Sequence, residues 1–109
     1  MGSIGSLEEI ILMILLKQEE CHGVEIAQHY EAVMEKSISL PAIHVVLKRM
    51  EKKGWVESHF GEPTAQRGGR RKRMYRPTSS GYYAIKQAQE VKAKLWASII
   101  QPKFNHGTI

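Results

Sequence analysis

The first half of the chain carries apolar residues at helical spacing and predicts three helices. Residues 7 to about 17 are apolar on nearly every side, which indicates a helix that is buried on more than one face. A second helix is predicted over about 22–35. A short polar turn follows, and Ser39 can cap a third helix that runs over about 40–53. Gly54 suits the left-handed position just beyond the end of that helix.

Two stretches in the middle of the chain alternate between apolar and polar residues and predict a β-hairpin. The strands are expected at 55–60 and 72–76, and a loop rich in Gly, Pro and Arg joins them over 61–71. A threonine or serine at 78–79 can cap a long final helix that ends near residue 100. The expected fold class is therefore mainly α with a small two-stranded antiparallel sheet. In this order the elements make a winged helix-turn-helix followed by a long C-terminal helix.

Charge is divided unevenly along the chain, and the division indicates a polyanionic partner. The formal net charge is +5. Residues 1–36 hold seven Glu against two Lys, whereas residues 37–109 hold fourteen Lys or Arg against four Glu. The densest run, 67–73, has five cations and no acid. A solvated loop could carry such a run, but patterned segments flank it on both sides, so a dedicated polyanion-binding surface is predicted.

On a helical wheel, the third predicted helix separates into two different faces. One face is expected to pack into the core, and it consists of Ile43, Val46, Leu47 and Met50. The opposite face and its flanks carry cations, a histidine and a valine. Such side chains can contact phosphates, base edges or a thymine methyl group in the major groove of duplex DNA.

The hairpin loop is expected to add a second set of DNA contacts. Gly68 and Gly69 keep the backbone thin, so that neighbouring arginines can approach the DNA backbone or enter a minor groove. Arginine suits that role because its guanidinium binds bidentately and is weakly hydrated. The residues predicted to bind DNA are Ser39, His44, Val45, Lys48, Arg49, Lys52, Arg67, Arg70, Arg71, Lys72 and Arg73.

An apolar stripe on the final helix predicts a homodimer. A small winged core cannot cover both this stripe and the apolar first helix, and burying each large side chain is worth roughly 1.5–3 kcal/mol. The stripe is therefore expected to pair with a second copy, with docking inside one chain as the alternative. The predicted interface consists of Leu7, Ile11, Ile14, Ala84, Ala88, Val91, Leu95 and Ile99. Residues 1–77 are expected to form the DNA-binding region, and 78–109 the dimerisation helix and tail of one compact domain.

From Leu7 to about Trp96 the chain resembles the PadR family of bacterial transcription regulators. The segment 39–54 looks like the recognition helix of that family, and 67–75 looks like its wing. Further matching stretches are 7–12, 22–26, 61–63 and 78–81. The short C-terminus resembles the subgroup that has a single helix after the wing.

The resemblance implies a dimeric repressor that binds an inverted repeat of double-stranded DNA. It also implies that the dimer interface can host a small aromatic effector. In some similar proteins a tryptophan from each final helix stacks on flat aromatic compounds, and Trp96 lies where such a residue would sit. Ordinary dimer packing by Trp96 is the alternative.

Enzymatic and membrane functions are not expected. The five histidines lack metal-ligand spacing and the single Cys21 has no partner, so neither a metal site nor a cofactor nor catalysis is predicted. The longest apolar run, 10–16, is shorter than the roughly 18–20 residues of a bilayer span. One cysteine fits a reducing compartment, so the protein is expected to be cytoplasmic and not to bind membranes.

Two other functions fit the same layout. One is an architectural module that binds DNA or RNA without sequence preference, and the other is a winged helix that binds proteins only. The mixture of polar and apolar groups on the third helix favours a regulator that reads bases.

Overall fold

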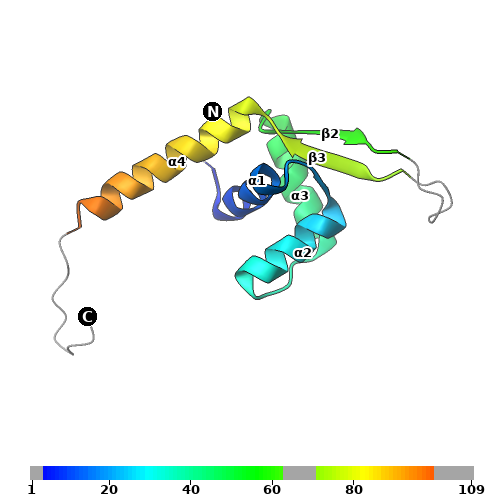
Figure 1. Cartoon of the computed structure of the whole chain (residues 1–109), viewed down its shortest axis with the longest axis horizontal. Helices are drawn as coiled ribbons and strands as arrows, with labels where there is room; N and C mark the ends of the chain where they lie inside the picture. Colours follow the sequence, from blue (N-terminus) through cyan, green and yellow to red (C-terminus); the bar gives the residue numbers. More distant parts are fainter. Residues whose placement is uncertain (1–3, 63–70, 100–109) are drawn as a thin grey trace.

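A computed structural model describes residues 4–62 and 71–99 of the chain. Four helices and three strands occur in these residues (Figure 1). Their order is α1 (Ser6–Gln18), β1 (Cys21–His22), α2 (Gly23–Met34), α3 (Leu40–Lys52), β2 (Val56–Phe60), β3 (Arg73–Pro77) and α4 (Ser79–Ala97). The winged helix-turn-helix arrangement that the sequence predicted is confirmed.

Each helix begins where a side chain satisfies its free backbone N–H groups. The Glu8 carboxylate accepts from the Gly5 N–H at 2.8 Å at the start of α1. Ser39 and Thr78 are the N-caps of α3 and α4, and their hydroxyl oxygens accept from backbone N–H groups three residues later, at 3.2 and 3.1 Å. Both caps agree with the sequence-based expectation. Gly54, with φ of +78°, lies in the left-handed region just after α3, as expected.

The sheet has three strands, not the two that were expected. Its order is β1-β3-β2, and both pairings are antiparallel. The additional strand β1 contains only two residues, Cys21 and His22, which lie opposite Tyr75 and Met74. A two-residue strand has no alternating pattern of its own. It forms because the turn after α1 passes along the free edge of β3.

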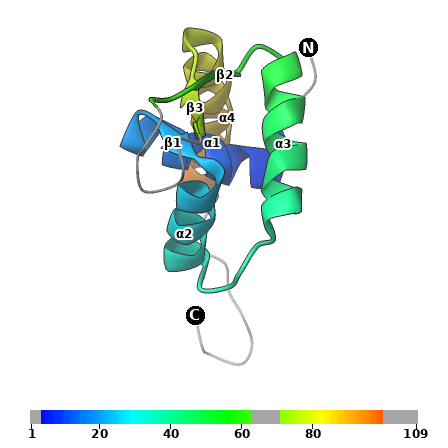
Figure 2. The same cartoon turned by 90° about the vertical axis from the view of Figure 1, so that its right-hand side faces the viewer.

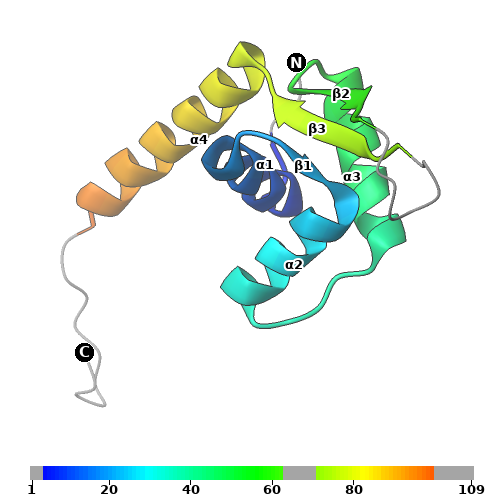
Figure 3. The same cartoon turned by 45° about the vertical axis from the view of Figure 1, so that its right-hand side comes forward.

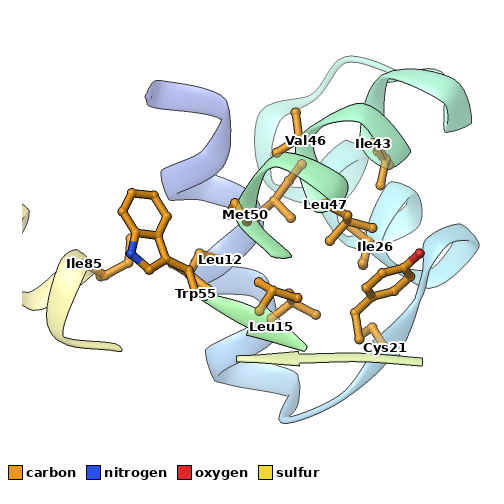
Figure 4. Close-up of a cluster of buried hydrophobic side chains, with 13 residues drawn as sticks. Leu12, Leu15, Cys21, Ile26, Ile43, Val46, Leu47, Met50, Trp55 and Ile85 are labelled. Carbon is orange, nitrogen blue, oxygen red and sulfur yellow. The ribbon is translucent and has the colours of Figure 1, made fainter. Parts of the chain in front are cut away.

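The core lies where the three N-terminal helices meet the inner face of the sheet (Figures 3 and 4). Helix α1 is central and contacts α2, α3, α4 and β3. The predicted core face of α3 is confirmed, since Ile43, Leu47 and Met50 are fully buried and Val46 almost so. At the end of the cluster nearest α4, the buried indole of Trp55 lies beside Ile85 (Figure 4).

Helix α4 leaves this body at a fixed point and then extends away from it, on the side opposite the β2-β3 hairpin (Figure 1). Its first turn is anchored because the Thr78 N–H donates to the Trp55 carbonyl at 3.0 Å and the Thr78 hydroxyl donates to the Gly54 carbonyl at 2.6 Å. Further along, Lys92 forms a 2.5 Å ion pair with Glu9 of α1.

Candidate nucleic-acid interface

Helix α3 presents its predicted polar face to solvent. His44, Lys48, Arg49 and Lys52 are exposed, and Val45 is 57% exposed among them. The residues were placed on that face by helical periodicity alone, and the structure agrees because the opposite face is held in the core. Figure 2 shows α3 on the outside of the molecule, joined to α2 by the short turn between them.

The cations on the exposed face of α3 are not held by acidic groups of the described residues. Within the described residues, no ion pair involves Lys48, Arg49 or Lys52. By contrast, Lys53 at the end of the same helix pairs with buried Glu8 at 3.1 Å. A face of unpaired cations keeps its full positive potential and is suited to bind a polyanion.

Helices α2 and α3 approach each other closely at Gly23. A Cβ atom on Gly23 would lie 2.9 Å from His44 Nε2 and 3.4 Å from Leu40 Cδ1. Glycine at this first position of α2 therefore leaves room for the side chains of His44 and Leu40. The sequence analysis missed this role, because it depends on a contact between two helices and not on a local pattern.

The hairpin sorts its side chains onto two faces, because successive residues of a strand point to opposite sides. Val56, Ser58 and Tyr75 belong to the inner face, which covers the core. The Ser58 hydroxyl also donates to Glu51 of α3 at 2.6 Å. Phe60 and Arg73 are directly opposite each other in the register and continue this inner face, so both lie on the side of the hairpin that holds α3.

The outer face of the hairpin carries cations that already have neighbours. Arg76 forms a 2.7 Å ion pair with Glu57, and Lys72 Nζ lies 3.4 Å from His22 Nε2. On the same face, His59 lies 2.5 Å from Glu20. Lys72 and Arg73, which the sequence analysis grouped together, are therefore on opposite faces of the wing. Of the predicted loop residues, Arg71 is exposed, while Arg67 and Arg70 lie outside the described residues.

The residues predicted for a dimer interface fall into two groups. Ile11 is fully buried and Ile14 nearly so, and Leu7 is half-buried against the same core. Ile11 and Ile14 are buried within a single chain, so Ile11 offers no surface to a second copy and Ile14 offers little. The corresponding positions on α4 are more accessible: Ala84 and Ala88 are half-buried, and Val91, Leu95 and Ile99 are exposed.

An open groove of about 830 Å³ runs between the N-terminus of α1 and the exposed side of α4. Ile4, Ala84, Ala88 and Val91 line it, together with the paired Glu9 and Lys92. Further along α4, Trp96 is 76% exposed. The apolar surface of this groove and of the end of α4 is continuous along one helix.

The described residues carry neither a side-chain cluster suited to a metal ion nor a helix suited to cross a membrane. No group of three or more His, Cys, Asp or Glu side chains among them could hold a metal ion. None of the helices in that part of the chain is both long and apolar enough to cross a membrane.

Comparison with known proteins agrees with this geometry. Residues 11–87, well over half of the chain, match the family model described as "Transcriptional regulator PadR-like family". A Lysinibacillus sphaericus protein, named uncharacterized protein X, is 31% identical over 97 residues, which are 87% of this chain and 82% of that protein.

Solved structures of transcriptional regulators have the same fold. A regulator from Clostridium thermocellum is 25% identical, with a TM-score of 0.66 over 90% of this chain and 99% of that one. Bacillus subtilis PadR, solved in complex with operator DNA, is 22% identical, with a TM-score of 0.63 over 92% of this chain and 51% of that one. With the family match across most of its helix-turn-helix and wing, this chain belongs to the PadR-like family of transcriptional regulators.

Proposed function

We propose that this chain is a homodimeric repressor that binds an inverted repeat of double-stranded DNA. The observation that carries the proposal is the exposed face of α3, on which Lys48, Arg49 and Lys52 have no acidic partner among the described residues. A helix of this size fits the major groove, where such cations can contact guanine edges and phosphates. Bacillus subtilis PadR, which has the same fold, was solved in complex with operator DNA, and this supports DNA binding here.

The wing supplies the second part of the proposed DNA surface. Arg73 is exposed on the α3 side of the hairpin, and Arg71 precedes it. These cations are expected to contact the phosphate backbone, which positions the protein and adds affinity without reading sequence. We propose that residues 1–77 provide DNA binding and that 78–109 provide dimerisation, in the cytoplasm where the DNA is accessible.

Dimerisation through α4 is supported by the apolar surface that this helix leaves open. Val91 and Leu95 are 62% and 66% exposed, and they continue the apolar groove beside α1. A helix end without packing is marginally stable in water. Pairing with a second copy would cover it, and the twofold axis would present two α3 helices to the two halves of an inverted repeat.

The DNA-binding proposal is tested with a duplex that the wild-type protein selects from a random-sequence pool, compared with a scrambled duplex at two salt concentrations. A regulator should prefer the selected duplex by roughly 10³-fold or more and should lose affinity steeply with salt. Lys48→Ala with Lys52→Ala should weaken binding by roughly tenfold or more. Lys86→Ala, an exposed lysine on α4, is the matched control and should bind as wild type.

Equal affinity for both duplexes would indicate an architectural nucleic-acid-binding module instead. Absence of duplex binding altogether would contradict the proposal and would favour a protein-binding winged helix. Repression itself is tested with a reporter gene placed behind the selected sequence, whose expression should fall when the protein is present.

The dimer is tested by sedimentation. Leu95→Glu should yield monomers, because a charge would be buried at the centre of the proposed interface. Val33→Glu is the matched control, since Val33 on α2 is 65% exposed and lies outside that surface. A wild-type protein that sediments as a monomer, or a Leu95→Glu variant that remains dimeric, would contradict the interface.

We further propose that a small planar aromatic effector binds at Trp96 and relieves repression. The exposed indole at 76% supports this, since an unpaired aromatic ring can stack on a flat ligand. Planar cationic dyes should quench the fluorescence of Trp96 and release the protein from DNA. Trp55 is 1% exposed, so Trp96→Phe should remove nearly all of the quenching. If no dye of a varied panel quenches the fluorescence, the effector proposal is refuted and Trp96 serves only in packing.

A further inference from the structure

Phe60 is an aromatic residue that the core does not use. It is the last residue of β2, and its side chain is 54% exposed. The exposed part of the phenyl ring contributes no stabilisation through burial. The ring lies beneath the guanidinium of Arg73, whose Cζ is 4.9 Å from the ring centroid. The two residues are direct cross-strand partners, so the backbone register brings them together.

The charge of this guanidinium also acts on Tyr75, two residues further along the same strand. Burial raises the pKa of Tyr75, while the positive charge of Arg73 and a hydrogen bond from it act against that rise. Tyr75 is thus a second neighbour of Arg73 beside the Phe60 ring. Both neighbours belong to the inner face of the hairpin, on the side of α3.

We propose that Phe60 is a positioning residue for DNA binding: its ring holds the Arg73 guanidinium on the α3 side of the wing, ready to donate to the DNA backbone. This inference rests on the proposed DNA-binding function. Stacking occupies only the flat face of a guanidinium and leaves its N–H edge free for phosphate oxygens. It also removes part of the side-chain entropy that a free arginine would lose on binding.

Two other described cations of the wing show why such a device matters. Arg76 is held by Glu57 on the outer face of the sheet, and Lys72 lies beside His22 on that face. Arg73 is thus the cation of this strand that has an aromatic neighbour and points to the α3 side. It therefore lies on the same side of the hairpin as α3, the helix that carries Lys48 and Lys52.

The test is a double-mutant cycle with Phe60→Leu, Arg73→Ala and the two combined, measured on the duplex selected by the wild-type protein. Phe60→Leu should weaken binding about two- to fivefold for each wing, the range expected of a cation–π contact at an exposed site. It should have no further effect once Arg73→Ala is present. Arg73→Ala should also lower the slope of log affinity against log salt by about one for each wing.

Two more variants separate positioning from folding. Phe60→Tyr keeps the ring and should bind as wild type, whereas Phe60→Met, which keeps only apolar bulk, should behave as Phe60→Leu. Because Phe60 is half exposed, all of these proteins should melt close to the wild type. A purely structural role would lower the melting temperature and would weaken binding equally with and without Arg73.

The inference is overturned if Phe60→Leu weakens binding equally in both backgrounds, or if Arg73→Ala changes neither affinity nor salt slope. In either case a loss of affinity in Lys48→Ala would still support the proposed function. A wild-type protein that binds no duplex would instead refute the function on which the inference depends.

Discussion

Replacing Gly81 by alanine is the sharpest test of how α4 is joined to the rest of the molecule. Gly81 lies in the first turn of α4, directly against the backbone of Trp55. An added Cβ would lie 2.3 Å from the Trp55 carbonyl oxygen, 3.1 Å from its carbonyl carbon and 3.3 Å from its Cα. These are backbone atoms, so no side-chain rotation can relieve the contact. The same Trp55 carbonyl accepts from Thr78, which ties it to the start of α4.

The magnitude follows from two opposing effects. Helix propensity alone predicts that Gly81→Ala stabilises the protein by up to about 1 kcal/mol. The contact predicts the reverse, because α4 must retreat by about 0.7 Å for the Cβ to reach even 3.0 Å from the oxygen. Overpacking of this kind costs about 1–3 kcal/mol. We therefore expect a net loss of about 1–2 kcal/mol, which corresponds to a fall in melting temperature of roughly 4–16 °C.

The assay is thermal and urea unfolding at one fixed protein concentration, because association would otherwise shift the apparent stability. Ser80→Ala, at the adjacent exposed position, is the matched control and should stay within about 0.5 kcal/mol of wild type. A Gly81→Ala variant that is as stable as wild type, or more stable, with an unchanged urea dependence would refute the close approach of α4 to Trp55.

Three further predictions concern charged and titratable groups. Lys53→Met should lower the free energy of unfolding by about 1–3 kcal/mol in urea, because Glu8 is 3% exposed and would lose the ion pair with Lys53, whose Nζ lies 3.1 Å from its carboxylate. An unchanged urea midpoint of unfolding would contradict the pairing. The hydrogen bond that the His59 ring donates to the Glu20 carboxylate raises the pKa of His59 above 6.5, so NMR titration should show that pKa falling in Glu20→Gln. The stability from this pair should be fully present below the unfolded pKa and should be lost as the pH rises through the raised folded pKa; a pKa that ignores the substitution would refute this. Burial raises the pKa of Cys21 to about 11. A thiol reagent should therefore modify the folded protein at pH 8 only as fast as the protein unfolds. Modification faster than unfolding would contradict this prediction.

The sequence predicted the helices well because their signals are local. Apolar periodicity placed α1 within a residue or so of Ser6–Gln18, and the capping residues Ser39 and Thr78 fixed the starts of α3 and α4. Strand β1 could not be predicted in the same way. Its two residues are ordered by pairing with Tyr75 and Met74, more than fifty residues later in the chain.

The candidate site was predictable on α3 and less so on the wing, for a physical reason. Helical spacing alone decides which side of α3 faces the core. On the hairpin, successive side chains of a strand alternate between two faces, so the sequence could have placed Lys72 and Arg73 on opposite faces. The position of Phe60 opposite Arg73 depends instead on the register of the two strands, which in a hairpin is set by the turn. The close approaches at Gly23 and Gly81 depend on packing between distant elements and have no local signal.

Helices α1 and α4 show that apolar composition alone does not identify an interface between two chains. The sequence indicated more apolar surface than a small winged core could cover, and it assigned parts of both α1 and α4 to a second copy. In the folded chain, α1 is the centre around which the other elements pack, so Ile11 is buried without any partner chain. Leu95, by contrast, lies beyond the anchored turns of α4 and stays 66% exposed. An apolar stripe is evidence for association only where the chain itself does not cover it. In this protein the uncovered apolar surface consists of the groove beside α1 and the exposed end of α4.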